Sequence, residues 1–151
     1  MFSIRKVTPD DADACTILGS LMHKDSQYAH MPFNAERVNW FIRNRFDGTN
    51  REGFVALHDD VIIGFLGVYA EVLYFTDAKT VFDIAMFVHP DYRHPRVSAQ
   101  LVFAAERWAQ SIGAHNIIMS VTAPEDGERV GNLYMRYGYK PLGQYYSKEV
   151  H

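Results

Sequence analysis

The sequence predicts an α/β protein of the mixed α+β kind. We expect about four helices to cover both faces of a central mixed sheet of about six to seven strands. Two observations support this class: strand-like and helix-like segments alternate along the chain, and hydrophobic residues make up 48% of the 151 positions. No repeat or linker-like tract interrupts the chain, so residues 1–151 are expected to form a single domain.

The first part of the chain predicts one strand followed by two helices. Residues 2–7 alternate between apolar and polar side chains, as a short strand does. A helix is expected over residues 8–23, with Thr8 as its N-cap. A second helix is expected over residues 35–46, with Asn34 in the same role.

Three further strands are predicted in the middle of the chain. Residues 53–60 and 61–75 have the pattern of a hairpin that turns at Asp59 and Asp60. Residues 80–88 form another apolar, β-branched run that is typical of a strand.

A long helix is predicted to follow from Pro95 and to stop at Gly113. Its apolar residues recur every three or four positions and so share one face: Val97, Leu101, Ala105, Trp108 and Ile112. The rest of the chain predicts a short buried strand at 116–123, a helix at 127–138 and a final strand at 139–150.

The junction before the long helix carries an unusual group of cations. Arg93, His94 and Arg96 lie where the helix dipole is positive, and no good capping residue is visible. Cations there cost about 0.3–1 kcal/mol each unless an anion compensates them. A phosphate or diphosphate group would do so, because the first helical N–H groups and guanidinium groups both bind it. The alternative is a solvated loop in which Asp91 neutralises the arginines.

Two motifs in this chain resemble the signatures of the GNAT acetyltransferase superfamily. One is the Val-x-Pro-x-x-Arg segment formed by Val88, Pro90 and Arg93, which also contains Tyr92. The other is a Leu-Tyr-x-x-x-Gly-aromatic segment formed by Leu133, Tyr134, Gly138 and Tyr139. The order of predicted elements also matches the family over essentially the whole chain. The two glycines usual in the family's phosphate loop are absent, and Arg96 and Ser98 stand in their places.

The resemblance implies direct transfer of an acetyl group from acetyl-CoA to an amine, with acetyl-CoA as cosubstrate. It implies that the cofactor binds along a strand end and the following turn, at Met86, Phe87, Val88, Arg93, His94, Arg96, Val97, Ser98 and Ala99. It also implies that the acceptor, a small molecule or a protein amino group, binds at the loop after the first helix. Ser26, Tyr28 and His30 are the candidate residues there.

Three residues are candidates for the chemistry. By the resemblance, Tyr134 would protonate the departing sulfur, and a phenol is a competent donor at neutral pH. Asp83 or Glu71 would accept the amine proton through water; we place Asp83 first because it interrupts an apolar strand. The structural alternatives are a core aromatic for Tyr134 and an edge-strand charge for Asp83.

Composition limits the remaining possibilities. A net charge of -3 argues against a protein that binds nucleic acid through general electrostatic attraction. The single cysteine excludes an intrachain disulfide, and we expect no metal. No apolar run suits a membrane span, so we expect a cytoplasmic protein. Homodimer formation through the last strand stays open. So does a second function, that of a GNAT-fold protein without catalysis that binds CoA or another protein.

Overall fold

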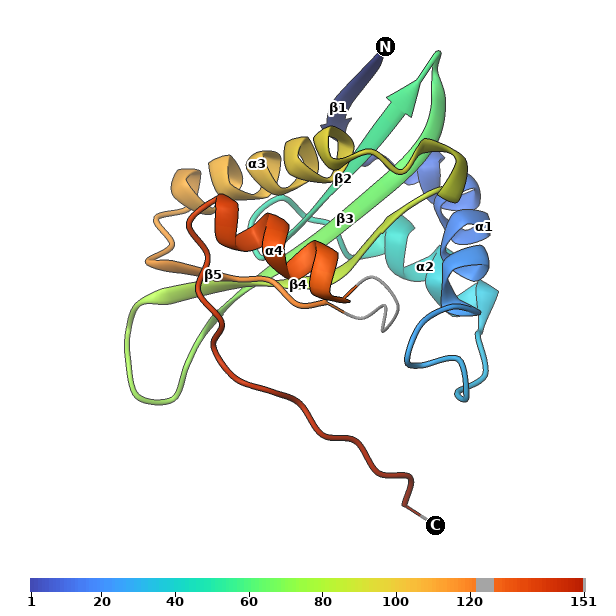
Figure 1. Ribbon diagram of the computed structural model, residues 1–151. Coiled ribbons are helices and arrows are strands. Elements are labelled where there is room, and N and C mark those ends of the chain that lie inside the picture. Colours follow the sequence, from blue (N-terminus) through green and yellow to red (C-terminus); the bar gives the residue numbers. More distant parts are fainter. Residues whose placement is uncertain (122–126, 151) are drawn as a thin grey trace.

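The computed structural model describes residues 1–121 and 127–150, and their strands form one mixed sheet (Figure 1). The strand order is β1-β2-β3-β4-β5. The first four strands pair antiparallel, and β5 runs parallel to β4. Their bounds are Phe2–Lys6 for β1, Arg51–His58 for β2, Val61–Val72 for β3, Lys79–Val88 for β4 and Asn116–Ile118 for β5.

Helices lie on both faces of this sheet, as expected (Figure 1). Two of them, α1 (Ala12–His23) and α2 (Ala35–Asn44), cover one face, and α3 (Pro95–Ser111) and α4 (Gly127–Arg136) lie on the other. Two short 3₁₀ helices, η1 (Pro9–Asp11) and η2 (Pro90–Tyr92), precede α1 and α3. No helix in the described ranges has the length and apolar composition needed to cross a bilayer.

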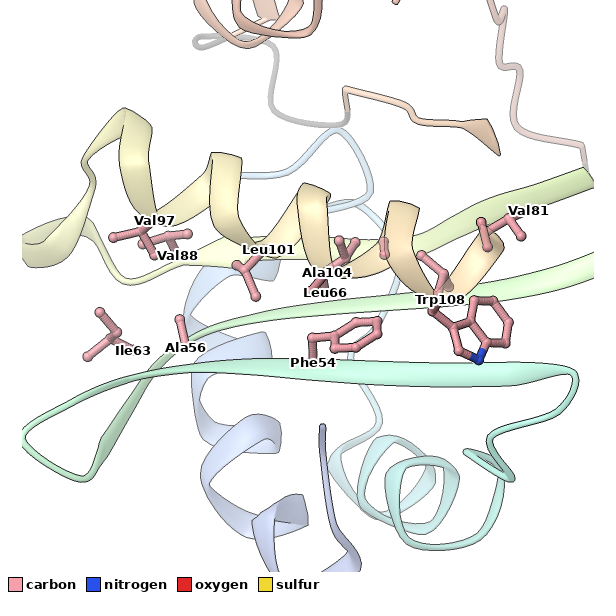
Figure 2. Packing of buried hydrophobic residues seen from close by; sticks show 13 residues of the cluster. Phe54, Ala56, Ile63, Leu66, Val81, Val88, Val97, Leu101, Ala104 and Trp108 are labelled. Carbon is pink, nitrogen blue, oxygen red and sulfur yellow. The ribbon is translucent and has the colours of Figure 1, made fainter. Parts of the chain in front are cut away.

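The larger core lies between α3 and the sheet (Figure 2). The predicted apolar face of this helix is confirmed: four of its five residues are buried, and Ile112 packs against the same cluster. They pack on side chains of β2, β3 and β4 that include Phe54, Leu66 and Val81. Close packing of this face fixes the position of the helix and therefore of the turn that precedes it.

A smaller core lies under α1 and α2 on the opposite face. Its buried members include Ala12, Cys15, Ile42 and Phe65. Cys15 is fully buried, and burial raises the pKa of its thiol to about 12. Cys15 is therefore a core residue, as its place in an amphipathic helix indicates.

Two local predictions made from single residues are also confirmed. Asn34 caps α2, because its side-chain oxygen accepts a hydrogen bond from the Arg37 N–H at 3.0 Å. The hairpin between β2 and β3 turns at Asp59 and Asp60, whose φ angles are 49° and 65°. Aspartate tolerates this left-handed conformation better than most residues do, which explains its presence at both turn positions.

The end of the chain differs from the prediction. Residues 139–150 were expected to form a strand, but they make no sheet pairing, and those after Tyr139 are exposed. They run away from the sheet toward the C-terminus (Figure 1). The strand expected over 116–123 is limited to the three residues of β5, and its last two positions lie outside the described residues. The described sheet therefore has five strands and not six or seven.

Strand β4 contains a β-bulge next to the candidate site. The antiparallel register pairs Val68 with Asp83 and Gly67 with Ala85, so Ile84 is one residue in excess on β4. A bulge of this kind bends the strand and increases its twist. The parallel pairing of β5 with β4 ends just before it, at the Phe82–Ile118 pair.

Candidate active site

The two parallel strands, β4 and the edge strand β5, separate at one end and leave an edge of β4 open. From Asp83 to Val88 the edge that faces away from β3 has no strand partner among the described residues. The opposite edge stays paired as far as Val88 with Gly64. Met86, Phe87 and Val88, three predicted cofactor-binding residues, lie along this opening. Those of their main-chain groups that point away from β3 can pair with an extended ligand, although their side chains pack in the cores.

Asp83 is the first residue of β4 beyond the last pair with β5. Its register partner Val68 belongs to the core under α3, so the carboxyl side chain points to the face that carries α3 and α4. The Ser120 hydroxyl donates a hydrogen bond to Asp83 Oδ2 at 2.8 Å. Burial raises the pKa of Asp83, and hydrogen bonds from the side chain and backbone of Ser120 oppose this effect.

Tyr134 lies near this carboxylate, on the inner face of α4. It is buried, and its hydroxyl donates a hydrogen bond to the Ser120 carbonyl oxygen at 3.3 Å. Burial raises the pKa of Tyr134 and the charge of Asp83 raises it further. The phenol therefore keeps its proton at neutral and mildly alkaline pH, as a proton donor requires.

Glu71, the second candidate base, lies apart from this pair. It is exposed near the end of β3, paired in register with Thr80. Its charge is felt at Tyr69, whose pKa is raised first by burial, then by Glu71 and by Asp83. The structure therefore brings Asp83 and Tyr134 together and leaves Glu71 in solvent.

The start of α3 corrects one expectation from the sequence. His94 is an effective N-cap: its Nδ1 accepts a hydrogen bond from the Arg96 N–H at 3.1 Å. Its carbonyl oxygen accepts a second one from the Val97 N–H at 3.0 Å. The expectation that this helix lacks a good capping residue is therefore wrong. The imidazole accepts a hydrogen bond from a first-turn N–H, as the side chain of a serine or asparagine cap usually does.

The two arginines of this turn differ in their surroundings. Arg93 Nε donates to the Val88 carbonyl oxygen at 3.5 Å, and its Nη2 lies 3.9 Å from the Met22 sulfur. Arg93 thus ties the turn to the end of β4 and to α1. Arg96 is exposed at the first turn of α3.

The other predicted cofactor-binding residues of the turn follow Arg96 within α3. The side chains of Val97 and Ala99 are buried in the protein, so only their main chain could meet a ligand. Ser98, between them, is half-buried.

The predicted acceptor loop follows α1. The Ser26 hydroxyl is engaged within the loop, where it donates to the His23 carbonyl oxygen and accepts from the Tyr28 N–H. Tyr28 is exposed, and the His30 ring lies 3.9 Å from the Glu149 carboxylate. Tyr28 and His30 are therefore accessible to a ligand, whereas Ser26 maintains the shape of the loop.

Sequence reasoning missed one residue of this site, Ser120, which contacts both candidate catalytic groups. No motif marks it, since its position depends on where β4 and β5 separate. Within the described ranges, no group of three or more His, Cys, Asp or Glu side chains is placed to hold a metal ion.

Solved structures share this architecture over almost the whole chain. A ribosomal-protein-alanine N-acetyltransferase from Brucella melitensis biovar Abortus 2308 superposes with a TM-score of 0.78 at 16% identity, covering 100% of both chains. The aminoglycoside N-acetyltransferase AAC(6')-Iy in complex with CoA gives 0.77 at 19% identity, covering 99% of this chain and 96% of that one. A predicted acetyltransferase from Clostridium acetobutylicum with acetyl-CoA gives 0.77 at 13%, with the same coverage.

The sequence comparisons decide the family. Among curated proteins, none matches the chain significantly. The profile of the acetyltransferase (GNAT) family matches residues 18–139, which include both motifs, the open edge of β4 and the candidate catalytic pair. The chain belongs to the GNAT acetyltransferase family.

Proposed function

We propose that this protein is an N-acetyltransferase that uses acetyl-CoA to acetylate a primary amine. One observation carries the proposal: the open edge of β4 begins at Asp83, and the buried hydroxyl of Tyr134 lies within the same hydrogen-bonded group. A strand edge that can bind an extended ligand thus begins beside an acid and a base of suitable chemistry. The CoA and acetyl-CoA complexes among the similar structures support this function.

The residues present fit acetyl-CoA. Along residues 83–88 one edge of β4 has no strand neighbour in the part of the chain that the structure describes, and its main-chain groups suit the amide groups of the pantetheine arm. The exposed Arg96 guanidinium suits the diphosphate. Since His94 already accepts the Arg96 N–H, the side chain of Arg96 supplies charge that the main chain supplies in glycine-rich phosphate loops.

Acetyl-CoA supplies the activated acetyl group and the sulfur leaving group. Asp83, through a water molecule, accepts the proton that the amine loses when its nitrogen bonds to the acetyl carbon. Tyr134 donates its phenolic proton to the sulfur as the carbon–sulfur bond breaks. Main-chain N–H groups at the open edge of β4 stabilise the negative charge that develops on the acetyl oxygen. Exchange with solvent then returns Asp83 and Tyr134 to their starting forms.

The acceptor in this proposal is a small-molecule or protein amine that enters beside the loop after α1. Two similar structures, named above, are acetyltransferases for aminoglycosides and for a ribosomal protein, so both substrate classes belong in the test. Tyr28 and His30, accessible on this loop, are the residues of this chain proposed to meet the acceptor.

Calorimetric titration with acetyl-CoA tests the first step, and we expect saturable binding with one site. A screen of aminoglycosides, amino acids, polyamines and N-terminal peptides, read out by release of free CoA thiol, tests the second step. No binding at millimolar acetyl-CoA would reject the proposal.

One feature of the turn before α3 favours a second function. Both glycines of the family's phosphate loop are absent, and the Arg96 N–H already donates to His94 and so is not free for a phosphate. In that case the fold binds CoA or a protein without catalysis. Binding of CoA without transfer to any amine would support this alternative.

A further inference from the structure

Ser120 lies just beyond β5, at the point where β4 and β5 separate. The last parallel pair joins Phe82 to Ile118, so Ser120 and Asp83 both follow the end of the pairing. Their side chains close the gap with a hydrogen bond of 2.8 Å. This bond connects the two strands where their backbones no longer do.

Ser120 also contacts the second candidate catalytic group. Its carbonyl oxygen accepts the hydrogen bond from the Tyr134 hydroxyl at 3.3 Å. One residue thus holds a carboxylate of β4 through its side chain and a phenol of α4 through its main chain. One contact fixes a group that would accept a proton, and the other fixes a group that would donate one.

We propose that Ser120 is the positioning residue of this site, holding Asp83 ready to accept a proton and Tyr134 ready to donate one. The inference rests on the proposed acetyltransferase function and adds a residue that belongs to neither family motif. Ser120 itself does not touch the reacting atoms in this proposal. Its hydroxyl stabilises the ionised form of Asp83. Its carbonyl oxygen holds the Tyr134 oxygen in place until the O–H turns from this carbonyl to the sulfur and donates its proton.

The electrostatics of the site agree with this role. Burial raises the Asp83 pKa, and the hydrogen bonds from Ser120 oppose that rise, so they keep more of the carboxylate in the basic form. Within residues 1–121 and 127–150, the titratable groups whose pKa the charge of Asp83 raises are Tyr134 on α4 and Tyr69 on β3. Both phenols have raised pKa values and stay neutral near pH 7. The charge of Glu71 also raises the pKa of Tyr69.

The test uses Ser120→Ala in the full-length protein, with kcat and KM measured between about pH 6 and about pH 9. Loss of a hydrogen bond to a charged group predicts a fall of roughly ten-fold in kcat near pH 6. The acidic limb of the profile should move to higher pH, so that the loss becomes smaller near pH 9. The KM for acetyl-CoA should stay within about two-fold, because the hydroxyl does not contact the cofactor in this proposal.

Three further variants make the result specific. Ser120→Thr keeps the hydroxyl and should restore the wild-type profile. Ser111→Ala, which removes a serine whose hydroxyl donates to the Trp108 carbonyl oxygen at the far end of α3, should leave the profile unchanged. If the alanine variant does not fold, Ser120→Cys replaces it, because a thiol is a weak donor of similar size and should shift the same limb.

Three outcomes would overturn the role, and they are distinguishable. An active wild type whose pH profile is the same in Ser120→Ala, or only lowered uniformly, rejects the positioning role and leaves the proposed function in place. A wild type that transfers acetyl to no amine rejects the proposed function and this role with it. Carbon-13 NMR titration of the Asp83 carboxyl, assigned with Asp83→Asn, gives a readout without activity. A titration unchanged by Ser120→Ala also rejects the role.

Discussion

The imidazole of His94 accepts the Arg96 N–H at 3.1 Å, and so the histidine closes the N-terminus of the helix that should face the diphosphate. This relationship gives the two residues different surroundings. His94 satisfies a main-chain N–H, whereas the Arg96 side chain is exposed, and we propose that it provides the charge for the diphosphate.

Replacing His94 should therefore affect stability. His94→Ala removes the acceptor for the Arg96 N–H, and loss of an N-cap typically costs about 1 kcal/mol. His94→Asn keeps a capping side chain and should retain most of that free energy of unfolding. Urea unfolding followed by circular dichroism measures both. Equal stability of His94→Ala and the wild type would show that the bond contributes nothing.

Replacing Arg96 should instead affect the cofactor. Arg96→Gln removes a charge-assisted contact to the diphosphate and should weaken acetyl-CoA binding roughly ten-fold, with unchanged stability. Arg107→Gln is the matched control, because Arg107 is an exposed arginine on the same helix, three turns farther along. Calorimetry with acetyl-CoA at two salt concentrations measures the difference. Equal affinity in both variants would contradict the role given to Arg96.

Tyr134→Phe should lower kcat by roughly 100-fold or more, since a general acid commonly contributes that much. Acetyl-CoA affinity should remain within about two-fold, because only the hydroxyl is lost. Tyr137→Phe serves as the control, since Tyr137 is partly exposed and its ring packs on Phe103 instead of on the candidate site. If Tyr134→Phe loses cofactor binding as well, the phenol is a binding contact and not the acid.

Asp83→Asn should have opposite effects on turnover and stability. The asparagine side chain cannot act as a base, so we expect kcat to fall roughly 100-fold. Since the folded-state pKa of Asp83 is raised, its protonation favours folding at acidic pH, and this contribution is lost as the pH rises through that pKa. The neutral variant should therefore be more stable than the wild type at pH 8, with the difference vanishing near pH 4.

Glu71→Gln provides the comparison for the base, because Glu71 is an exposed carboxylate on the neighbouring strand. We expect it to leave both kcat and urea unfolding nearly unchanged. A large loss of turnover in Glu71→Gln with little change in Asp83→Asn would assign the base to Glu71 instead.

Features determined by neighbouring residues could be predicted from the sequence. The periodicity of α3, the cap at Asn34 and the turn at Asp59 and Asp60 all depend on a few adjacent side chains and are confirmed. The prediction of a strand at 139–150 is wrong because it, too, used only adjacent side chains. Its aromatic residues favour extended backbone, but a strand also needs a neighbour, and local propensity carries no information about pairing.

The candidate site shows the same division. Tyr134 and Asp83 carry signals in the sequence, one in a motif and one as an acid among apolar strand residues. The His94 cap could have been recognised from its position directly before a proline that begins a helix. Ser120 could not, since its two partners lie 37 and 14 positions away and meet it only because the strands diverge.

Ile84, the extra residue of the bulge in β4, lies beside the candidate catalytic residue Asp83. Ile84 is 38% exposed, so many different amino acids should be acceptable there. Removing the codon altogether would make β4 regular and take away the bend that accompanies the departure of β5. At this position natural selection would act on how many residues the gene encodes and hardly at all on which one.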